Sequence, residues 1–244
     1  MRRNEKKKKF RFGRILFLLL TLFLLVYPFF AFRAHKKALQ LPIAQSVNEN
    51  YPGIGQRTVE QQDGYTTTFT TIEEHQKVYK EYKQNGRASW AGLPYWSGTM
   101  SDNGCGITAL SIILSGYGKN FTPEDLRQKY YPRLDSDEIS SELRDSFGID
   151  CTDFYYASSY FSQSYLMDHL QKNRPVLICV WTENGENRWT TTSHYLVLLA
   201  TDGIDQVYIS NPNGEDHTPK SSGWYSFEEI TPYIAKALFI ESDQ

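Results

Sequence analysis

The sequence has few of the residues from which metal sites, nucleotide sites and disulfide frameworks are built. Three cysteines and five histidines occur in 244 residues, and they lack the close spacing of a zinc site. There is no glycine-rich loop of the phosphate-binding kind. Beyond the first residues, no basic stretch is interleaved with aromatic side chains as a nucleic-acid groove would be. We therefore expect no metal, no organic cofactor and no nucleic-acid partner.

The cationic charge is concentrated at the N-terminus. Residues 1–14 carry a run of lysines and arginines, so the formal net charge of -2 averages a basic tail with a distinctly acidic remainder. Residues 15–32 are an uninterrupted apolar run without a charged side chain, about long enough to span a bilayer as a helix. A cleaved signal peptide would usually have a shorter apolar run followed by small residues, which Phe32 and Arg33 do not provide. We expect an uncleaved, single-pass anchor.

The basic flank predicts the orientation of this anchor. By the positive-inside rule the basic tail stays in the cytoplasm, which places everything after the anchor outside the cell membrane. Residues 33–71 are polar and interrupted by proline and glycine, so we expect an extracellular spacer with little core of its own. Residues 72–244 carry the periodic apolar pattern of one folded domain.

Within that domain the predicted helices come first and the predicted strands follow. A short opening helix is expected over residues 75–83, and Cys105 begins a buried helix that the glycines at 116 and 118 end. Thr122-Pro-Glu-Asp125 and Ser226-Phe-Glu-Glu229 are helix-start signals. Further helices are expected over residues 137–147 and 163–173, and strands over 176–181, 194–200, 206–210 and 237–240. Helices segregated from an antiparallel sheet predict an α+β fold.

An unpaired thiol outside the cell needs an explanation, because three cysteines cannot all pair within one chain. Cys151 and Cys179 lie in apolar surroundings typical of buried small side chains. Cys105 is at the first turn of a helix, where the helix dipole favours the nucleophilic thiolate. Gly104 and Gly106 flank it without side chains and would let a substrate carbonyl approach. A tight turn with a packed cysteine is the competing interpretation.

A nucleophilic cysteine needs a base that is distant in sequence but adjacent in space. His194 begins a strand directly after a polar loop, so a rigid element would hold it at a cleft. Asn211 ends the next strand and could orient the imidazole. Taken singly, each has a structural alternative: a half-buried histidine, or an ordinary Asn-Pro turn.

The order of these motifs is similar to that of a known family. Asp-Asn-Gly-Cys105-Gly-Ile-Thr-Ala-Leu, then Arg-Pro-Val-Leu-Ile, His194-Tyr-Leu-Val-Leu-Leu and Tyr-Ile-Ser-Asn211-Pro resemble the bacteriocin-processing-like, double-glycine-type cysteine peptidases over about residues 90–240. The resemblance implies a papain-like α+β fold, Cys105 as nucleophile, His194 as base, Asn211 as orienting residue and a peptide or protein substrate. With the predicted anchor, it indicates an extracellular peptidase of the Gram-positive bacterial type.

Two features of the resemblance stay open. Papain-like enzymes usually have a glutamine a few residues before the cysteine as an oxyanion donor, and residues 97–103 contain none. Asn103 is our candidate, ahead of Ser101 and Thr99, because an amide side chain can present the donor. Many relatives have an aspartate where this chain has Asn211, and either residue can accept the imidazole hydrogen bond.

Trp96 and Trp181 are candidates for a substrate groove, although core or rim packing is the commoner role of such residues.

The missing glutamine leaves two alternative functions open. The domain could be a binding module that kept the papain-like shell with weak or no catalysis. It could also be an amidase or acyltransferase that acts on cell-wall peptides with the same three residues.

Overall fold

The computed structural model describes residues 57–62, 65–72, 77–86, 88–181, 189–213 and 222–242. All of them belong to one compact unit, residues 44–244. The predicted anchor over residues 15–32 lies outside the described residues. Among the residues that are described, no helix is both long and apolar enough to cross a membrane.

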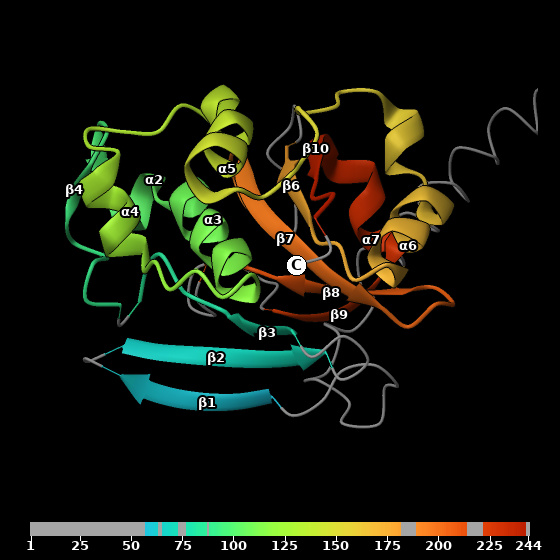
Figure 1. Ribbon diagram of the computed structural model, residues 1–244, viewed down its shortest axis with the longest axis horizontal. Helices are drawn as coiled ribbons and strands as arrows, with labels where there is room; N and C mark the ends of the chain where they lie inside the picture. The colour runs from blue at the N-terminus through green and yellow to red at the C-terminus, as the bar shows by residue number, and fades with distance from the viewer. Residues whose placement is uncertain are drawn as a thin grey trace, which may run out of the picture. The chain divides into compact units, whose positions relative to one another are not determined.

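A five-stranded antiparallel sheet forms the centre of the domain (Figure 1). Its strand order is β10-β6-β7-β8-β9. The bounds are Val176–Val180 for β6, His194–Thr201 for β7, Gln206–Ser210 for β8, Gly223–Ser226 for β9 and Ile234–Phe239 for β10. Three of these strands, β6, β7 and β8, match predicted strands, whereas β9 was not predicted and β10 begins earlier than expected. The mixture of helices with an antiparallel sheet confirms the α+β class.

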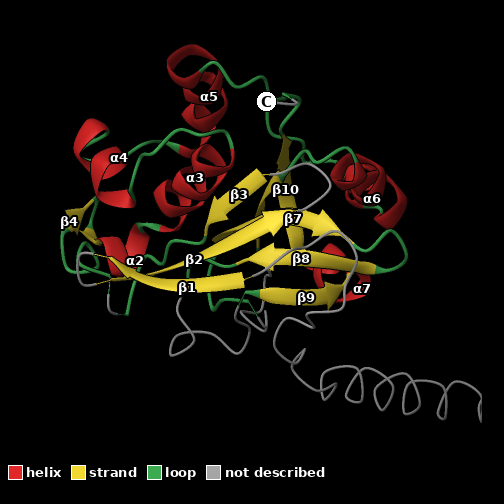
Figure 2. Cartoon of the chain, turned by 60° about the horizontal axis from the view of Figure 1, so that its bottom comes forward, coloured by secondary structure: helices red, strands yellow, loops and turns green. Residues whose placement is uncertain are grey.

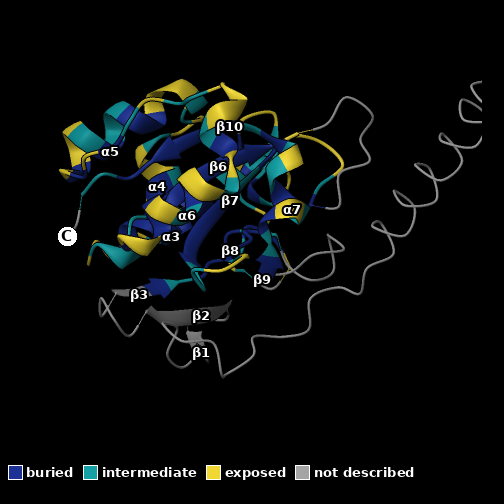
Figure 3. Ribbon diagram, turned by 90° about the vertical axis from the view of Figure 1, so that its right-hand side faces the viewer, coloured by how far each residue is buried: buried dark blue, intermediate teal, exposed yellow. Residues whose placement is uncertain are grey.

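Helices cover both faces of this sheet. Successive residues of a strand point to opposite faces, so Val197 and Leu199 of β7 pack with α3, and Leu196 and Leu198 pack on the other side. Figure 1 shows α3 and α5 on one side of β7 and α6 and α7 on the other. The two apolar clusters leave β6 and β7 buried on both faces (Figure 3).

Helix α3, Cys105–Gly116, is the central helix of the domain. Every residue from Ile107 to Ser115 is buried, which agrees with the predicted buried helix. Gly116 lies against the ring of Tyr79, and a Cβ at this position would overlap that ring. The close packing of α3 on β3 and β7 fixes the position of the helix start that carries Cys105.

The other predicted helices are confirmed with small shifts at their ends. Helix α4, Pro123–Lys129, is capped by the Thr122 side chain, which accepts a hydrogen bond from the Asp125 backbone N–H. Helix α5, Ile139–Phe147, ends at Gly148 in the left-handed region and follows a short 3₁₀ turn, η1 (Ser136–Glu138). A further 3₁₀ turn, η2 (Ser158–Phe161), precedes α6, Gln163–Gln171; α7, Phe227–Ile230, leads into η3 (Thr231–Tyr233).

The opening helix predicted for residues 75–83 is wrong. Lys77–Lys80 form strand β3, which pairs with β2, Tyr65–Ile72, and β2 pairs with β1, Arg57–Gln62 (Figure 2). The helical periodicity was outweighed by tertiary contacts, because Tyr79 and Tyr82 are buried in the cluster around α3. Strand β1 and most of β2 lie in the segment predicted to be a spacer, so this segment is not without regular structure.

A hairpin and a short helix lead into α3 and were not predicted. Strands β4, Pro94–Tyr95, and β5, Gly98–Thr99, pair with each other, and α2, Met100–Asn103, follows at once. Thr99 and Asp102 form a reciprocal capping box at the start of α2. This capping box fixes the start of α2, the short helix that directly precedes Gly104 and Cys105.

Candidate active site

Cys105 is the first residue of α3 and is half-buried. Burial raises the pKa of its thiol above the ordinary value, and hydrogen bonds from the backbone N–H groups of Tyr195, Gly106 and Cys105 itself oppose this shift. We expected the helix start to lower the pKa and favour the thiolate. That expectation is wrong, because desolvation of the sulfur raises the pKa by more than the backbone hydrogen bonds at the helix start lower it. The resting cysteine is a neutral thiol.

His194 is the first residue of β7, and only 3% of its surface is exposed. Its ring Nε2 lies 2.8 Å from Asn211 Oδ1. The pKa of His194 is lowered to about 4, chiefly by burial; the hydrogen bond to Asn211 opposes this shift, and the positive charge of Lys83 adds a smaller lowering. The imidazole is therefore neutral near pH 7, which is the state that a general base requires.

The hydrogen bonds around Asn211 determine which ring nitrogen of His194 carries the proton. Asn211 Oδ1 also accepts a hydrogen bond from the backbone N–H of Asn213 at 2.9 Å, so this atom is an oxygen and can only accept. His194 Nε2 is then the donor, and Nδ1 keeps a free lone pair. Asn211 is itself fully buried, and its backbone N–H donates to Ser222 Oγ at 2.9 Å. The pair is held rigidly, and Nδ1 is the ring nitrogen that is able to accept a proton.

Lys83 adds a cation to the surroundings of this pair. Its Nζ donates to the backbone carbonyl of Asn211 at 2.6 Å and to Ser222 Oγ at 2.9 Å. The lysine thus ties the segment after β3 to the end of β8 and contributes to the low pKa of His194. The sequence alone gave no reason to select it.

The structure joins His194 with Asn211 directly and brings Cys105 to the start of the same strand. The backbone N–H of Tyr195, the residue after His194, faces the Cys105 sulfur, and the N–H of His194 faces that of Cys179. No hydrogen bond joins the Cys105 thiol to the His194 ring in the described part of the chain. Catalytic hydrogen bonds are often long in unliganded enzymes and shorten when substrate binds.

The environment of Gln84 is relevant to the missing oxyanion donor. Gln84 is 3% exposed and lies just after β3, far upstream of Cys105 in sequence. Its Nε2 donates to the backbone carbonyl of Ser101 in α2 at 2.8 Å, and its backbone N–H donates to the carbonyl of Pro212 at 2.8 Å. The side chain oxygen has no hydrogen-bond partner. Gln84 therefore connects the segment before the cysteine to the segment after Asn211.

Gln84 was not predicted as a donor, because it lies far upstream of Cys105 in the sequence and only the fold brings it to α2. Asn103, the predicted donor, lines a pocket together with Cys105, and its Nδ2 makes a long 3.4 Å hydrogen bond to the carbonyl of Tyr95. An amide NH₂ group has two donors, so Gln84 keeps one after its bond to Ser101. Both residues are candidates for the donor.

The other predicted substrate-site residues have different positions. Trp96 lines the pocket that contains Cys105, is 58% exposed and stacks against the Arg133 guanidinium at 4.6 Å. Gly106 also lines this pocket, with the Tyr195 ring at ordinary contact distance from an added Cβ. Gly104 has a packing role, because a Cβ there would overlap the Met100 carbonyl. Trp181 is 48% exposed at the end of β6 and is not among the residues that line this pocket.

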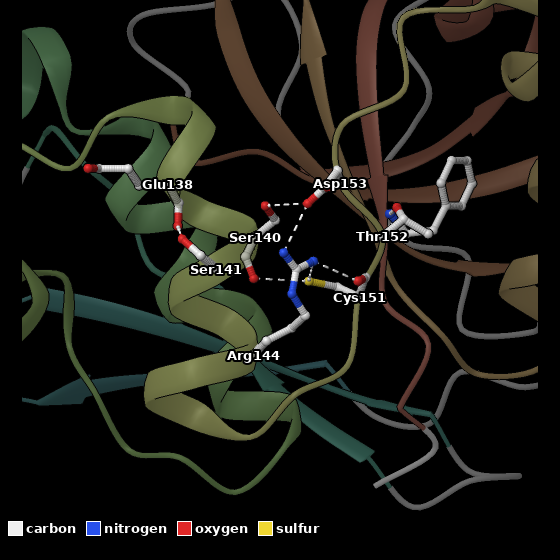
Figure 4. Close-up of polar contacts among 8 residues, drawn as sticks. Glu138, Ser140, Ser141, Arg144, Cys151, Thr152 and Asp153 are labelled. Carbon is white, nitrogen blue, oxygen red and sulfur yellow. Dashed lines mark hydrogen bonds and ion pairs between the residues drawn. The ribbon is translucent and has the colours of Figure 1, made fainter.

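The remaining cysteines are buried, as predicted, but in unlike surroundings. Cys179 lines the same pocket as Cys105. Cys151 lies between α5 and β10, where its thiol donates to the Ser140 carbonyl at 3.4 Å and Arg144 donates to its backbone oxygen at 3.0 Å (Figure 4). Burial raises the pKa of both thiols to about 11. These two cysteines are poor nucleophiles at neutral pH. Within the described ranges, no three metal-ligating side chains gather at one point.

A helix-start cysteine beside a strand that begins with an oriented, neutral histidine is the arrangement of a thiol-dependent hydrolase. The comparison with protein families agrees with this class. Residues 79–232 match the model of the Peptidase_C39 like family, and the chain belongs to this family of papain-like cysteine peptidases. The match includes Gln84, Cys105, His194 and Asn211. Among curated proteins, none matches the sequence closely enough to count as a relative.

Proposed function

We propose that this protein is a papain-like cysteine peptidase in which Cys105 is the nucleophile, His194 the general base and Asn211 the residue that orients it. The observation that carries the proposal is the fixed tautomer of His194, whose Nε2–H donates to Asn211 and whose Nδ1 is unprotonated. Membership in a peptidase family and the position of Cys105 support the same conclusion.

The neutral resting pair defines how the reaction begins. His194 Nδ1 takes the thiol proton as the Cys105 sulfur attacks the carbonyl carbon of the peptide bond. The imidazolium then protonates the leaving amine, and the C–N bond breaks to give a thioester. Water, deprotonated by the neutral ring, attacks this thioester and releases the acid product. The sulfur recovers its proton, so the cycle needs no other reactant.

The developing negative charge on the carbonyl oxygen needs donors in place. The backbone N–H of Cys105 at the start of α3 is one of them. Gln84 is the better candidate for the second, because its amide is buried, held against Ser101 and still has one N–H to donate. Asn103 remains the alternative, since it lines the pocket beside Cys105.

Replacement of Cys105 by alanine tests the assignment. The Cys105→Ala variant should fold, fail to react with a substrate-like peptide vinyl sulfone and lose hydrolysis of peptide substrates. Cys151→Ser and Cys179→Ala are matched controls, because each removes a thiol and leaves the proposed nucleophile, so both should still be labelled. Undiminished hydrolysis by the Cys105→Ala variant would refute the assignment.

A binding module with little catalysis is the second candidate. It is favoured by the raised pKa of Cys105 and by the lack of a thiol–imidazole hydrogen bond in the described residues. Single-turnover acylation with an activated thioester or p-nitrophenyl ester separates the two functions. A peptidase forms the acyl-enzyme on Cys105, whereas a binding module retains the ester unchanged. Cell-wall peptide fragments tested beside protein substrates would reveal action on wall peptides.

We also propose that residues 15–32 anchor the chain as a single span, with residues 1–14 in the cytoplasm and the peptidase domain outside. The support is the apolar run and its basic flank in the sequence. Mild protease treatment of intact cells should release the domain and leave the N-terminal tail protected. A domain that resists the protease until the cells are lysed would contradict this orientation.

A further inference from the structure

The pocket beside Cys105 has a volume of about 540 Å³ and is lined by several charged side chains. Asp102, Arg133, Asp135 and Lys236 contribute both signs of charge, next to the rings of Tyr95, Trp96 and Tyr195. Pockets of this size hold a side chain or a small ligand, and their few polar groups determine orientation and specificity. The charged groups that line this pocket therefore indicate which class of ligand it binds.

Three of the four charged groups already have close partners within the protein. Asp102 accepts hydrogen bonds from the backbone N–H of Thr99 at 2.9 Å and from its hydroxyl at 2.7 Å. Arg133 and Asp135 form an ion pair with each other. These groups stabilise the turns on which they lie. The Arg133–Asp135 pair balances its own charge, whereas Asp102 is held by neutral donors and keeps its negative charge.

Lys236 differs from these groups. Its side chain is only 11% exposed, and its nearest carboxylate is Asp137 Oδ1 at 3.6 Å, from a side chain that is 83% exposed. The ammonium donates to Ser136 Oγ at 3.1 Å and lies over the Phe154 ring at 4.3 Å, with Tyr195 and Tyr156 at 5.6 and 5.8 Å. Burial of an ammonium is costly unless an anion compensates it, and a solvated carboxylate at this distance does so weakly.

The fold fixes Lys236 on the same face of the sheet as the sulfur of the proposed nucleophile. Lys236 pairs with Cys179, and Cys179 pairs with Tyr195, so the three side chains form a row across β10, β6 and β7. All three line the pocket with Cys105. His194, the proposed proton donor to the leaving amine, is not among the lining residues, which favours a position of the pocket on the acyl side of the scissile bond.

We propose that this pocket binds an acidic side chain, glutamate or aspartate, on the acyl side of the cleaved bond, with Lys236 as its counter-ion. The inference rests on the proposed peptidase function and adds a substrate class to it: peptides with a carboxylate within the first three residues before the scissile bond. A substrate carboxylate completes the charge balance of Lys236, and the surrounding rings exclude water from the pair.

Binding to the catalytically dead chain tests this site apart from hydrolysis. Peptides that differ only by glutamate or glutamine at each of the three positions are titrated calorimetrically into full-length Cys105→Ala protein. At one position the glutamate peptide should bind about tenfold more tightly, as expected for one charge-assisted hydrogen bond. In the Cys105→Ala, Lys236→Met double variant this ratio should fall to about one, since methionine keeps the apolar stem without the charge. Lys172→Met, which removes an exposed lysine directly after α6, is the matched control and should leave the ratio unchanged.

A second variant keeps the proposal testable if Lys236→Met does not fold. Asp137→Asn removes the weak competing carboxylate at an exposed position, so the preference for glutamate should rise about two- to threefold, by loss of a surface ion pair. Equal binding of the two peptides at all three positions, no binding of either, or a ratio unaffected by the variants would overturn the proposal. If the preference is present but wild-type protein hydrolyses none of the peptides, the acidic subsite stands and the peptidase function fails.

Discussion

The burial of His194 predicts a loss of stability in mild acid. Its pKa is about 4 in the folded protein against 6.5 for an ordinary histidine. The unfolded chain therefore binds more protons than the folded one below pH 6.5, so the free energy of unfolding falls as the pH is lowered from about 6.5 to about 4. At 1.36 kcal/mol for each pKa unit, the loss from this one ring is about 3 kcal/mol, a large part of the stability of a typical domain.

The measurement is denaturant unfolding of the full chain in detergent, followed by tryptophan fluorescence at pH 7, 6, 5 and 4. Other groups titrate over the same range, so the informative quantity is the difference between wild type and His194→Gln, in which the side chain can still donate to Asn211. Wild type should lose about 3 kcal/mol more than the variant between pH 7 and pH 4. His169→Gln is the control, because it removes a second buried histidine with a lowered pKa. The contribution of His194 to the loss of stability in acid should be unchanged in this variant. Parallel curves for wild type and His194→Gln would show that burial does not keep the ring neutral.

Three further predictions concern the site. In a chain with Cys151→Ser and Cys179→Ala, alkylation of Cys105 by iodoacetamide should rise about tenfold with each pH unit from pH 7 to beyond pH 9, because burial raises its pKa; a reactive plateau at pH 5–6 would indicate a thiolate–imidazolium pair instead. Gln84→Ala should lower kcat by about 10²- to 10³-fold and Asn103→Ala by much less, as steady-state kinetics will measure; the reverse order would assign the oxyanion donor to Asn103. Gly104→Ala should destabilise the domain by about 1–3 kcal/mol in urea unfolding through overlap with the Met100 carbonyl, whereas Gly106→Ala should remain folded, and equal stabilities would contradict the packing role of Gly104.

The elements with strong local signals could be predicted from the sequence. The Thr122 cap, the Ser226-Glu229 box and the apolar spacing of residues 107–114 each indicate a helix through neighbours in the chain, and the structure has α4, α7 and α3 there. The strand at residues 77–80 could not be predicted from local signals. Their strand depends on pairing with β2 and on burial of Tyr79 against Gly116, and neither contact is encoded locally.

The same distinction applies to the site. The chain order of Cys105, His194 and Asn211 indicated a reaction class, and the structure adds the hydrogen bond between the last two. The pKa of Cys105 could not be predicted, because it depends on how much protein surrounds the sulfur as well as on its place at a helix start. Gln84 was missed since only the folded chain brings it to Ser101. Lys236 was missed because its role depends on strand register.

The alternation of side chains along β7 has an evolutionary consequence. His194 and Tyr195 are successive residues of the strand, so their side chains point to opposite faces of the sheet, and Tyr195 lines the pocket. Substitutions at Tyr195, or at its partners Cys179 and Lys236 across the sheet, can reshape the pocket while the histidine and its asparagine stay untouched. Paralogues of this chain could thus diverge in the peptides they select and conserve the chemistry, whereas the insertion of one residue near the start of β7 would exchange the two roles and destroy both.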